Sequence, residues 1–535
     1  MDIIHRTKKR LISLLERFIL RSEERAAIKK LQHEFSQQQE KVGKPLTVAV
    51  DGLLCMRFVF LYYLFLLLLL RYKSERPVQL VVICGDRKNC HAAANRMYSW
   101  FFPTVYVPLE GFLTDSELKQ AAVDVQDILE KAADGNALFS LWYKGFNIGQ
   151  DVYYAYLRDK LIGTINQTPS DLAIIIRRAV NYTNVAEKLI RIHKPEYLLI
   201  TDNCYATFSP LFHTFLRHDI PVGLTVTHAS GTGKVCGRLY TSIDEAENVT
   251  RRYPFSYTDE TWQQLLIDYD DNSDEITGAY LRERFAGNDL IFDGSYHKFT
   301  TRISNDALRK ELGVPSFCRK TVLLAAHLFW DNPGYKGLYR DYELWLKDTL
   351  DIIAENPFVC WIVKAHPSEI RIGTNRYARD VFHERFSSDI PPHIVFLDAD
   401  TKLNTYSLID FVDAVLTVRG TIGFEAACKG KLVVTAGTGP HSGLDIAKEF
   451  SSKEEYRTYL LGFHNVNTTL DELYLKNARM ALYGYFTLKA PCSPMLKRGD
   501  RLAAYANLSS DELYNDAVLN RIVDKMISKK GGDFL

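Results

Sequence analysis

The stretch that decides the fold is VCWIVKAHPSE (359–369), followed by HIVFLDADTKLNTYSLIDFVDAVLTVRGTIGFEAACKGKLVVTAG (393–437). Segments with helical spacing, Leu403–Phe411 and Ile422–Lys429, alternate in it with short apolar runs. This alternation predicts a parallel α/β sheet that is buried on both faces. The runs are β-branched or aromatic and end in polar residues or glycine: Cys360–Val363, Ile394–Leu397, Ala414–Val418 and Leu432–Thr435.

Two polar clusters follow these predicted strands. The first is Lys364-Ala365-His366-Pro367, and the second is Arg419-Gly420-Thr421-Ile422-Gly423-Phe424-Glu425. Ligands of parallel α/β sheets bind beyond the carboxyl ends of the strands. The second cluster begins where a strand gives way to a helix, so free backbone N–H groups and the helix dipole would favour an anion. We therefore predict a nucleotide-phosphate site.

Length and composition limit the class of protein. At 535 residues the chain is too long for one core, so two α/β domains with appendages are expected. Apolar residues make up 47% and charged residues 24%, as in globular rather than disordered proteins. The net charge of +1 does not indicate a nucleic-acid partner. The nine cysteines form no metal-ligand spacing, so we expect reduced thiols in a cytoplasmic protein and no structural zinc.

Two segments raise the question of membrane contact. Residues 1–43 read as an amphipathic helical segment, which either packs on the next domain or lies on anionic lipid through residues 1–40. Residues 53–70 are apolar without interruption only from Phe58, whereas a bilayer span needs about 20 residues. Because this segment lies between two predicted strands, we expect a buried crossover helix. Contact with the inner face of the cytoplasmic membrane through 53–70 is the alternative.

The domain organisation follows from the remaining pattern. Residues 44–315 are predicted to form a first Rossmann-like domain with a helical insertion at 115–193, and residues 316–480 a second. Asp244–Leu308 is expected to be polar and helical, with the Asp-rich turn Asp268–Asp274 as a surface connection, and 481–535 to form C-terminal helices. The predicted strands of the first domain are Leu46–Val50, Val78–Cys84, Thr104–Val107, Tyr197–Thr201 and Val222–Thr227.

These motifs resemble the GT-B glycosyltransferases of bacterial capsule and surface polysaccharide synthesis. KAHP and RGTIGFEAACKGKLVV carry the resemblance, and HLFWDNPG (327–334), DYELWLKDTL (341–350) and GQDVYYAYLR (149–158) add to it. The likeness is strongest over residues 320–440. Within that group, Lys-x-His-Pro is similar to the motif of enzymes that use CMP-sugars, such as Kdo transferases and bacterial sialyltransferases. Those enzymes usually carry Ser-Ser or Ser-Thr where this chain has Arg419-Gly420-Thr421.

The resemblance implies an α/β GT-B fold, with two Rossmann-like domains that face a cleft. It implies a metal-independent, inverting transferase without a cofactor, which binds a nucleotide-sugar donor in the second domain and a glycan or lipid-linked acceptor in the first. The C-terminal helices would brace the first domain. Three alternatives stay open: a nucleotide-sugar epimerase, a CDP-polyol phosphotransferase, and an inactive scaffold in a polysaccharide synthase complex.

Sugar transfer requires that the leaving phosphate be neutralised, and several side chains of the second domain are suited to this. We expect His366 to bind the phosphate and act as general acid, Lys364 to supply charge, and Pro367 to stiffen the turn. A strand-end cap and a solvated side chain are the plain alternatives for His366 and Lys364. Arg419 either joins the phosphate site or pairs with Glu425. The other predicted donor contacts are the phosphate ligands Gly420 and Thr421, and the ribose ligand Glu425, whose buried carboxylate would otherwise lack a partner.

The acceptor hydroxyl must lose a proton, and we look for the base at the strand ends of the first domain. His228 has a suitable ordinary pKa, and Asp202 either is the base or orients the histidine. Asp51 is a third candidate, unless it caps the following helix. His327 and Asp331 are expected to face the cleft, where they contact substrate or order their loop.

Overall fold

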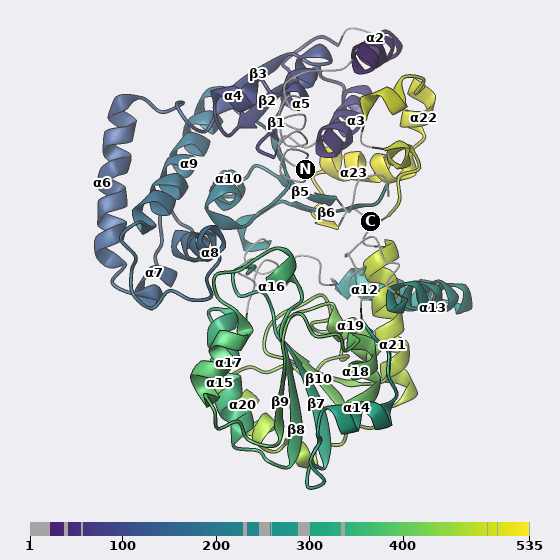
Figure 1. The fold of residues 1–535 in the computed structure, drawn as a ribbon. Helices are drawn as coiled ribbons and strands as arrows, with labels where there is room; N and C mark the ends of the chain where they lie inside the picture. Colours follow the sequence, from purple (N-terminus) through teal and green to yellow (C-terminus); the bar gives the residue numbers. More distant parts are fainter. Residues whose placement is uncertain are drawn as a thin grey trace, which may run out of the picture.

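The computed structural model describes residues 22–36, 41–54, 57–227, 233–245, 257, 259–286, 300–332, 337–488, 491–499 and 501–533. It contains two sheets, one in each domain (Figure 1). The first has the order β12-β6-β5-β4-β1-β2-β3. In it β6 runs antiparallel to both of its neighbours, β5 and β12, and the other neighbouring strands are parallel. Its strands are β1 (Leu46–Asp51), β2 (Val78–Cys84), β3 (Thr104–Pro108), β4 (Tyr197–Ile200), β5 (Val222–Thr227), β6 (Val235–Tyr240) and β12 (Gly532–Asp533).

The second sheet is parallel throughout, with the order β11-β10-β7-β8-β9. Both sheets reverse their strand order next to their first strand, between β1 and β4 and between β7 and β10, which is the place where such sheets bind ligands. Two Rossmann-like domains of this kind form the predicted GT-B fold. The strands are β7 (Lys320–Ala325), β8 (Val359–Lys364), β9 (Ile394–Leu397), β10 (Ala414–Thr417) and β11 (Leu432–Thr435).

Helices cover both sheets. In the first domain they are α2 (Ser22–Ser36), α3 (Arg57–Lys73), α4 (Arg87–Cys90), α5 (Ala93–Met97), α6 (Asp115–Lys131), α7 (Gly135–Phe139), α8 (Ile148–Lys160), α9 (Leu172–His193), α10 (Tyr205–Arg217), α22 (Ser510–Tyr514) and α23 (Ala517–Ser528). Around the second sheet they are α12 (Asp259–Asp268), α13 (Asp271–Phe285), α14 (Asn305–Glu311), α15 (Tyr342–Ala354), α16 (Ser368–Arg371), α17 (Ala378–Phe386), α18 (Thr405–Phe411), α19 (Ile422–Ala427), α20 (Lys453–Leu461) and α21 (Glu472–Tyr483).

Helix α3 is the buried crossover between β1 and β2. Every residue from Val59 to Leu70 is at most 5% exposed, because the sheet, α2, α5, α22 and α23 surround the helix. The alternative of a membrane contact through 53–70 is therefore wrong for residues 59–70. Among the described residues no helix is long and apolar enough to cross a bilayer. Residues 1–21 and 37–40 of the predicted amphipathic segment lie outside the described residues, while α2 buries its apolar side chains in the same core.

The chain returns to the first domain at its C-terminal end. Figure 1 shows the yellow helices α22 and α23 beside the purple α3. Helix α23 packs on α3, and the Tyr197 hydroxyl donates a hydrogen bond to the Met526 carbonyl at 2.8 Å. Strand β12 then pairs with β6 at the edge of the first sheet. These contacts tie the C-terminal segment to the first domain.

Two described helices of the segment Asp244–Leu308, α13 and α14, lie apart from the first domain, in which the predicted boundary of 44–315 places them. Helix α13 packs on α21 and α14 packs on α18, so both belong to the second domain. Leu281 and Leu308 are buried in its core. The Asp-rich turn Asp268–Asp274 is a mostly exposed connection between α12 and α13, as predicted, and the Asp270 carboxylate caps α13 by accepting a hydrogen bond from the Ser273 N–H.

Candidate functional site

Three loops of the second domain meet at the carboxyl end of its sheet. His327 follows β7, His366 follows β8, and Gly420 follows β10. The two imidazole rings lie 6.2 Å apart with an interplanar angle of 21°. A Cβ placed on Gly420 would lie 3.3 Å from Nε2 of His327. The structure therefore brings together the residues that the sequence placed at separate strand ends.

Lys364 is the last residue of β8 and is only 6% exposed. Within the described residues its ammonium has no hydrogen-bond or ion-pair partner. Burial lowers the pKa of Lys364 to about 8, although the charge of Glu369 opposes this shift. A buried cation without a partner destabilises the folded state, and a bound anion would relieve that cost. Lys364 is therefore the centre of a candidate anion site.

His366 beside it is a neutral hydrogen-bond donor. Its Nδ1 accepts a hydrogen bond from the Ser368 N–H at 3.2 Å, so the ring proton resides on Nε2. Burial, together with the charge of Lys364, lowers the pKa of His366 to about 4. Near neutral pH the ring can thus donate one hydrogen bond to a phosphate. Its role as general acid stays a prediction, because the imidazolium is scarce unless an anion raises this pKa.

His327 is neutral for the same reason. Burial, His366 and Arg419 lower the pKa of His327 to about 3. Its ring lies 5.0 Å from the ring of Tyr342. Because Tyr342 also stacks under the guanidinium of Arg419, with Cζ 5.5 Å from the ring centroid, one tyrosine orders two predicted site residues.

The predicted alternative of an Arg419–Glu425 pair is wrong. Glu425 is bonded by Arg284 of α13, with Nε and Oε1 2.8 Å apart, and both side chains are less than a tenth exposed. The prediction of a ribose contact rested on a buried carboxylate without a partner, and Arg284 removes that reason. Pro367 begins α16, and Thr421 begins α19 without a side-chain cap. Phosphate contacts from Gly420 and Thr421 stay predictions.

A pocket of about 670 Å³ opens beside Arg419. Its lining includes Gly437, on which a Cβ would lie 3.5 Å from Nη2 of Arg419. Hydroxyl groups, backbone amides, the Glu449 carboxylate and the Phe450 ring line it, a mixture suited to a small polar molecule with a flat ring. The sequence reasoning missed this pocket, although the glycines in Gly437-Thr438-Gly439 could have indicated it.

The first domain presents carboxylates at its own sheet end. Asp202 follows β4 and accepts a hydrogen bond from the Cys204 N–H at 3.0 Å. Asp151 of α8 accepts one from the Ser209 hydroxyl. Burial raises the pKa of both groups, that of Asp151 to about 8 with the help of the Asp202 charge. Asp151 was missed because only the folded insertion brings α8 to β4, although it lies in the quoted GQDVYYAYLR segment.

Arg158 connects this region to the second domain. Its Nη1 donates to the Tyr205 hydroxyl at 2.8 Å and lies 3.3 Å from Oδ1 of Asp331. Asp331 follows β7, and Tyr205 follows β4 with a positive φ of 63°. The carboxyl ends of the two sheets therefore meet around Arg158, and Asp331 lies at this junction.

The Asp51 carboxylate forms structural hydrogen bonds within the first domain. Its Oδ1 accepts from the Leu53 N–H at 2.7 Å, and its Oδ2 accepts from the Thr201 N–H at 3.2 Å and from the Thr201 hydroxyl. Since α3 begins only at Arg57, the predicted helix cap is wrong, and Asp51 instead ties β1 to β4. Its predicted role in the cleft stays a prediction. The predicted base His228 lies outside the described residues.

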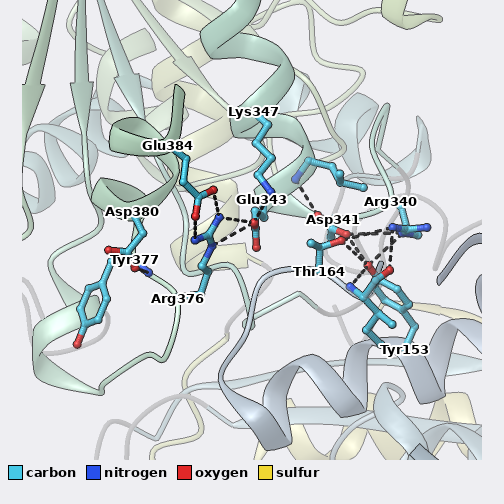
Figure 2. Close-up of polar contacts among 12 residues, drawn as sticks. Tyr153, Thr164, Arg340, Asp341, Glu343, Lys347, Arg376, Tyr377, Asp380 and Glu384 are labelled. Atoms are coloured by element: carbon cyan, nitrogen blue, oxygen red, sulfur yellow. Dashed lines mark hydrogen bonds and ion pairs between the residues drawn. The ribbon is translucent and has the colours of Figure 1, made fainter. Parts of the chain in front are cut away.

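A buried network fixes α8 against the start of α15 (Figure 2). The Tyr153 hydroxyl donates to Oδ2 of Asp341 at 2.5 Å, and Nε of Arg340 donates to Tyr153 at 3.0 Å. Figure 2 also shows the Arg376 guanidinium between the carboxylates of Glu343 and Glu384. The helix that carries Asp151 is thereby held by the domain that carries Lys364.

The described ranges contain no group of three His, Cys, Asp or Glu side chains that could hold a metal ion. With a candidate anion site in one domain and carboxylates in the other, the molecule has a GT-B fold with two chemically different sheet ends.

No protein-family model matches the sequence, and no curated protein matches it. Among solved structures, UDP-GlcNAc 2-epimerase from Neisseria meningitidis is 11% identical, with 90% of this chain and 100% of that one covered and a TM-score of 0.23. KpsC from Thermosulfurimonas dismutans, a β-Kdo 2,4-transferase, is 15% identical, with 53% of this chain and 79% of that one covered and a TM-score of 0.32. A second KpsC structure from the same organism, a β-Kdo 2,7-transferase, is 13% identical, with 65% of this chain and 89% of that one covered and a TM-score of 0.32. These values are too low to assign an activity to this chain.

Proposed function

We propose that this chain is a glycosyltransferase that moves a sugar from a nucleotide-activated donor, CMP-linked by preference, to a glycan or lipid-linked acceptor of a bacterial surface polysaccharide. The proposal includes a metal-independent reaction with inversion in the cytoplasm, at or near the membrane. One observation carries it: the buried ammonium of Lys364 has no partner among the described residues, at the strand end where this fold binds ligands.

In this proposal the second domain binds the donor. Lys364 neutralises the phosphate, and His366 donates a hydrogen bond to it from Nε2. The pocket beside Arg419 takes the nucleoside, because its Phe450 ring, hydroxyl groups and backbone amides match a base and a ribose. As the sugar–phosphate bond breaks, negative charge grows on the phosphate oxygen, where Lys364 and Arg419 stabilise it.

The first domain binds the acceptor and removes its proton. Asp202, with Asp151 beside it, accepts the proton of the attacking hydroxyl, and His228 is the alternative base. Burial raises the pKa of Asp202, which makes its carboxylate a better proton acceptor than an ordinary aspartate. The hydroxyl oxygen bonds to the anomeric carbon, the phosphate leaves with the former bond pair, and attack from the opposite side inverts the centre.

One observation also favours a second candidate, a nucleotide-sugar epimerase. A carboxylate pair such as Asp151 and Asp202 can take a proton from a sugar carbon as well as from a hydroxyl. This enzyme would use the same nucleotide site but no acceptor. Incubation with a nucleotide-sugar alone separates the two, because an epimerase then forms an isomerised sugar and a transferase does not.

A thermal-shift titration with CMP, CDP, UDP and GDP tests the proposal. A ligand at about 100 times its Kd stabilises the folded state by about 2.7 kcal/mol. We expect one nucleotide, CMP first, to raise the Tm of the wild type and of Lys476→Met, which alters an exposed lysine of α21. The shift should disappear in Lys364→Met and in His366→Ala. A folded wild type that responds to none of the four would contradict the proposal and favour the scaffold alternative.

A further inference from the structure

Glu369 is a buried carboxyl group behind the anion site that the proposed reaction does not use. It lies on α16, five residues after Lys364, and is 1% exposed. Its Oε1 accepts a hydrogen bond from the Ala378 N–H at 3.2 Å. Its Oε2 has no hydrogen-bond partner among the described residues. Such an oxygen is costly while the carboxyl is charged, so a compensating charge is expected nearby.

Charged groups from three neighbouring elements face Glu369. Lys364 comes from the end of β8, Asp398 from the end of β9, and Arg379 and Asp380 from α17. Arg379 is already bonded to Asp398, with Nη1 and Oδ2 3.2 Å apart. Arg379 still favours the charged form of Glu369, and the charge of Glu369 in turn raises the pKa of Lys364.

Lys364 and Glu369 are thus two buried groups of opposite sign, and neither forms an ion pair within the described residues. Each favours the charged form of the other through space. Both belong to the turn between β8 and α17, which His366 and Pro367 also shape. A change of charge on one of them therefore shifts the pKa of the other.

We propose that Glu369 is a positioning residue that keeps Lys364 charged before a phosphate binds, and that it takes up a proton when the phosphate replaces it as the partner of Lys364. This inference rests on the proposed role of Lys364 in donor binding. Nucleotide binding is then coupled to proton uptake near neutral pH, with the proton supplied by solvent.

The direction of the coupling follows from the charges. Burial, Asp398 and Asp380 raise the pKa of Glu369 to about 7, so the carboxyl is about half ionised at pH 7. A bound phosphate adds negative charge and draws Lys364 away from it, and both effects raise this pKa further. The uptake at pH 7 should therefore approach about half a proton. By linkage, affinity should fall as the pH rises through 7.

Isothermal titration calorimetry at pH 7.0 in PIPES and in Tris measures this uptake, because the two buffers differ in ionisation enthalpy. The probe is the nucleotide among CMP, CDP, UDP and GDP that gives the largest thermal shift. We expect wild type to take up at least 0.3 proton more per bound nucleotide than Glu369→Gln, which still binds at pH 6. Glu472→Gln, an exposed glutamate of α21, should match wild type. Protonation of the nucleotide itself is common to all variants and cancels.

Equal uptake by wild type and Glu369→Gln would overturn the inference while leaving the nucleotide site intact. A wild type that binds no nucleotide would instead overturn the proposed function. Should Glu369→Gln fail to fold, Asp398→Asn gives the second test. It removes one negative charge near Glu369 and releases Arg379, so the pH of maximal uptake should shift downward. An unchanged pH of maximal uptake would overturn the inference.

Discussion

The carboxyl ends of the two sheets share one topology but differ in chemistry. The second sheet ends in a buried lysine, neutral histidines and an arginine, whereas the first ends in carboxylates with a raised pKa. Both surround a reversal of strand order, so the fold supplies the location in both cases. The side chains determine the chemistry, because one end can hold an anion and the other can accept a proton. The comparison shows why fold alone does not assign function.

The largest expected effect is a loss of stability when the buried Arg284–Glu425 ion pair is broken, which should leave nucleotide binding at the anion site intact. Arg284→Met leaves the Glu425 carboxylate buried without its partner, so the free energy of unfolding should fall by about 3–5 kcal/mol. Denaturant unfolding measures this loss. Arg457→Met, which breaks the exposed pair with Glu355, should cost far less, because solvent screens that pair. Folded Arg284→Met that no longer binds nucleotide would show that Glu425 belongs to the site after all.

The next effect concerns binding rather than stability. Lys364→Met removes a charged hydrogen-bond donor worth about 1.5–3 kcal/mol, so nucleotide affinity should fall roughly 10- to 150-fold. The free energy of unfolding should stay equal or rise, since a buried ammonium is replaced by an apolar side chain of similar length. Calorimetry and denaturant unfolding give the two values. A destabilised variant with unchanged affinity would make Lys364 a framework residue.

A pH-dependent effect tests the carboxylate end. The pKa of Asp151 is about 8 in the folded state, while an ordinary aspartate in the unfolded chain is near 3.9. The folded state therefore binds the extra proton, and this stability is present below about pH 4 and is lost as the pH rises through 8. The Tm of Asp151→Asn relative to wild type should increase from pH 5 to 8. The curve of Asp115→Asn, an exposed control, should run parallel to wild type. A parallel curve for Asp151→Asn would contradict the assignment.

The smallest effect lies between the two ends. Arg158 and Asp331 are each about half exposed, so their ion pair should contribute less than about 1 kcal/mol. A double-mutant cycle with Arg158→Met and Asp331→Asn measures the coupling energy. A value well above this limit would mean that the junction itself holds the domains together, in place of the buried Tyr153–Asp341 contact.

The sequence predicted the second sheet well because each of its strands is a short apolar run, and all but the edge strand β9 are buried over most of their length. It missed β6, since VCGRLY carries a glycine and an arginine. Arg238 is accommodated there only by Glu245 and by Asp533 of β12, which lies almost three hundred residues away. Such compensation is a tertiary contact that no local pattern reveals.

The site shows the same division. Lys364 and His366 could be predicted because a strand end fixes where adjacent polar residues point. Glu425 was assigned to a ligand because its partner Arg284 lies on α13, a helix that the predicted boundaries placed in the first domain. Asp151 was missed because its environment depends on how the insertion folds back on β4 and α10. The location of strand-end residues at the sheet end was thus predictable, and contacts made by packing between distant segments were not.

The most direct measurement is a crystal structure with the nucleotide that gives the largest thermal shift. We expect a phosphate oxygen within about 3.2 Å of Nζ of Lys364 and of Nε2 of His366. We also expect the base in the pocket lined by Gly437 and Phe450. A nucleotide bound only at the carboxylate end of the first sheet, with Lys364 still lacking a partner, would contradict the central claim.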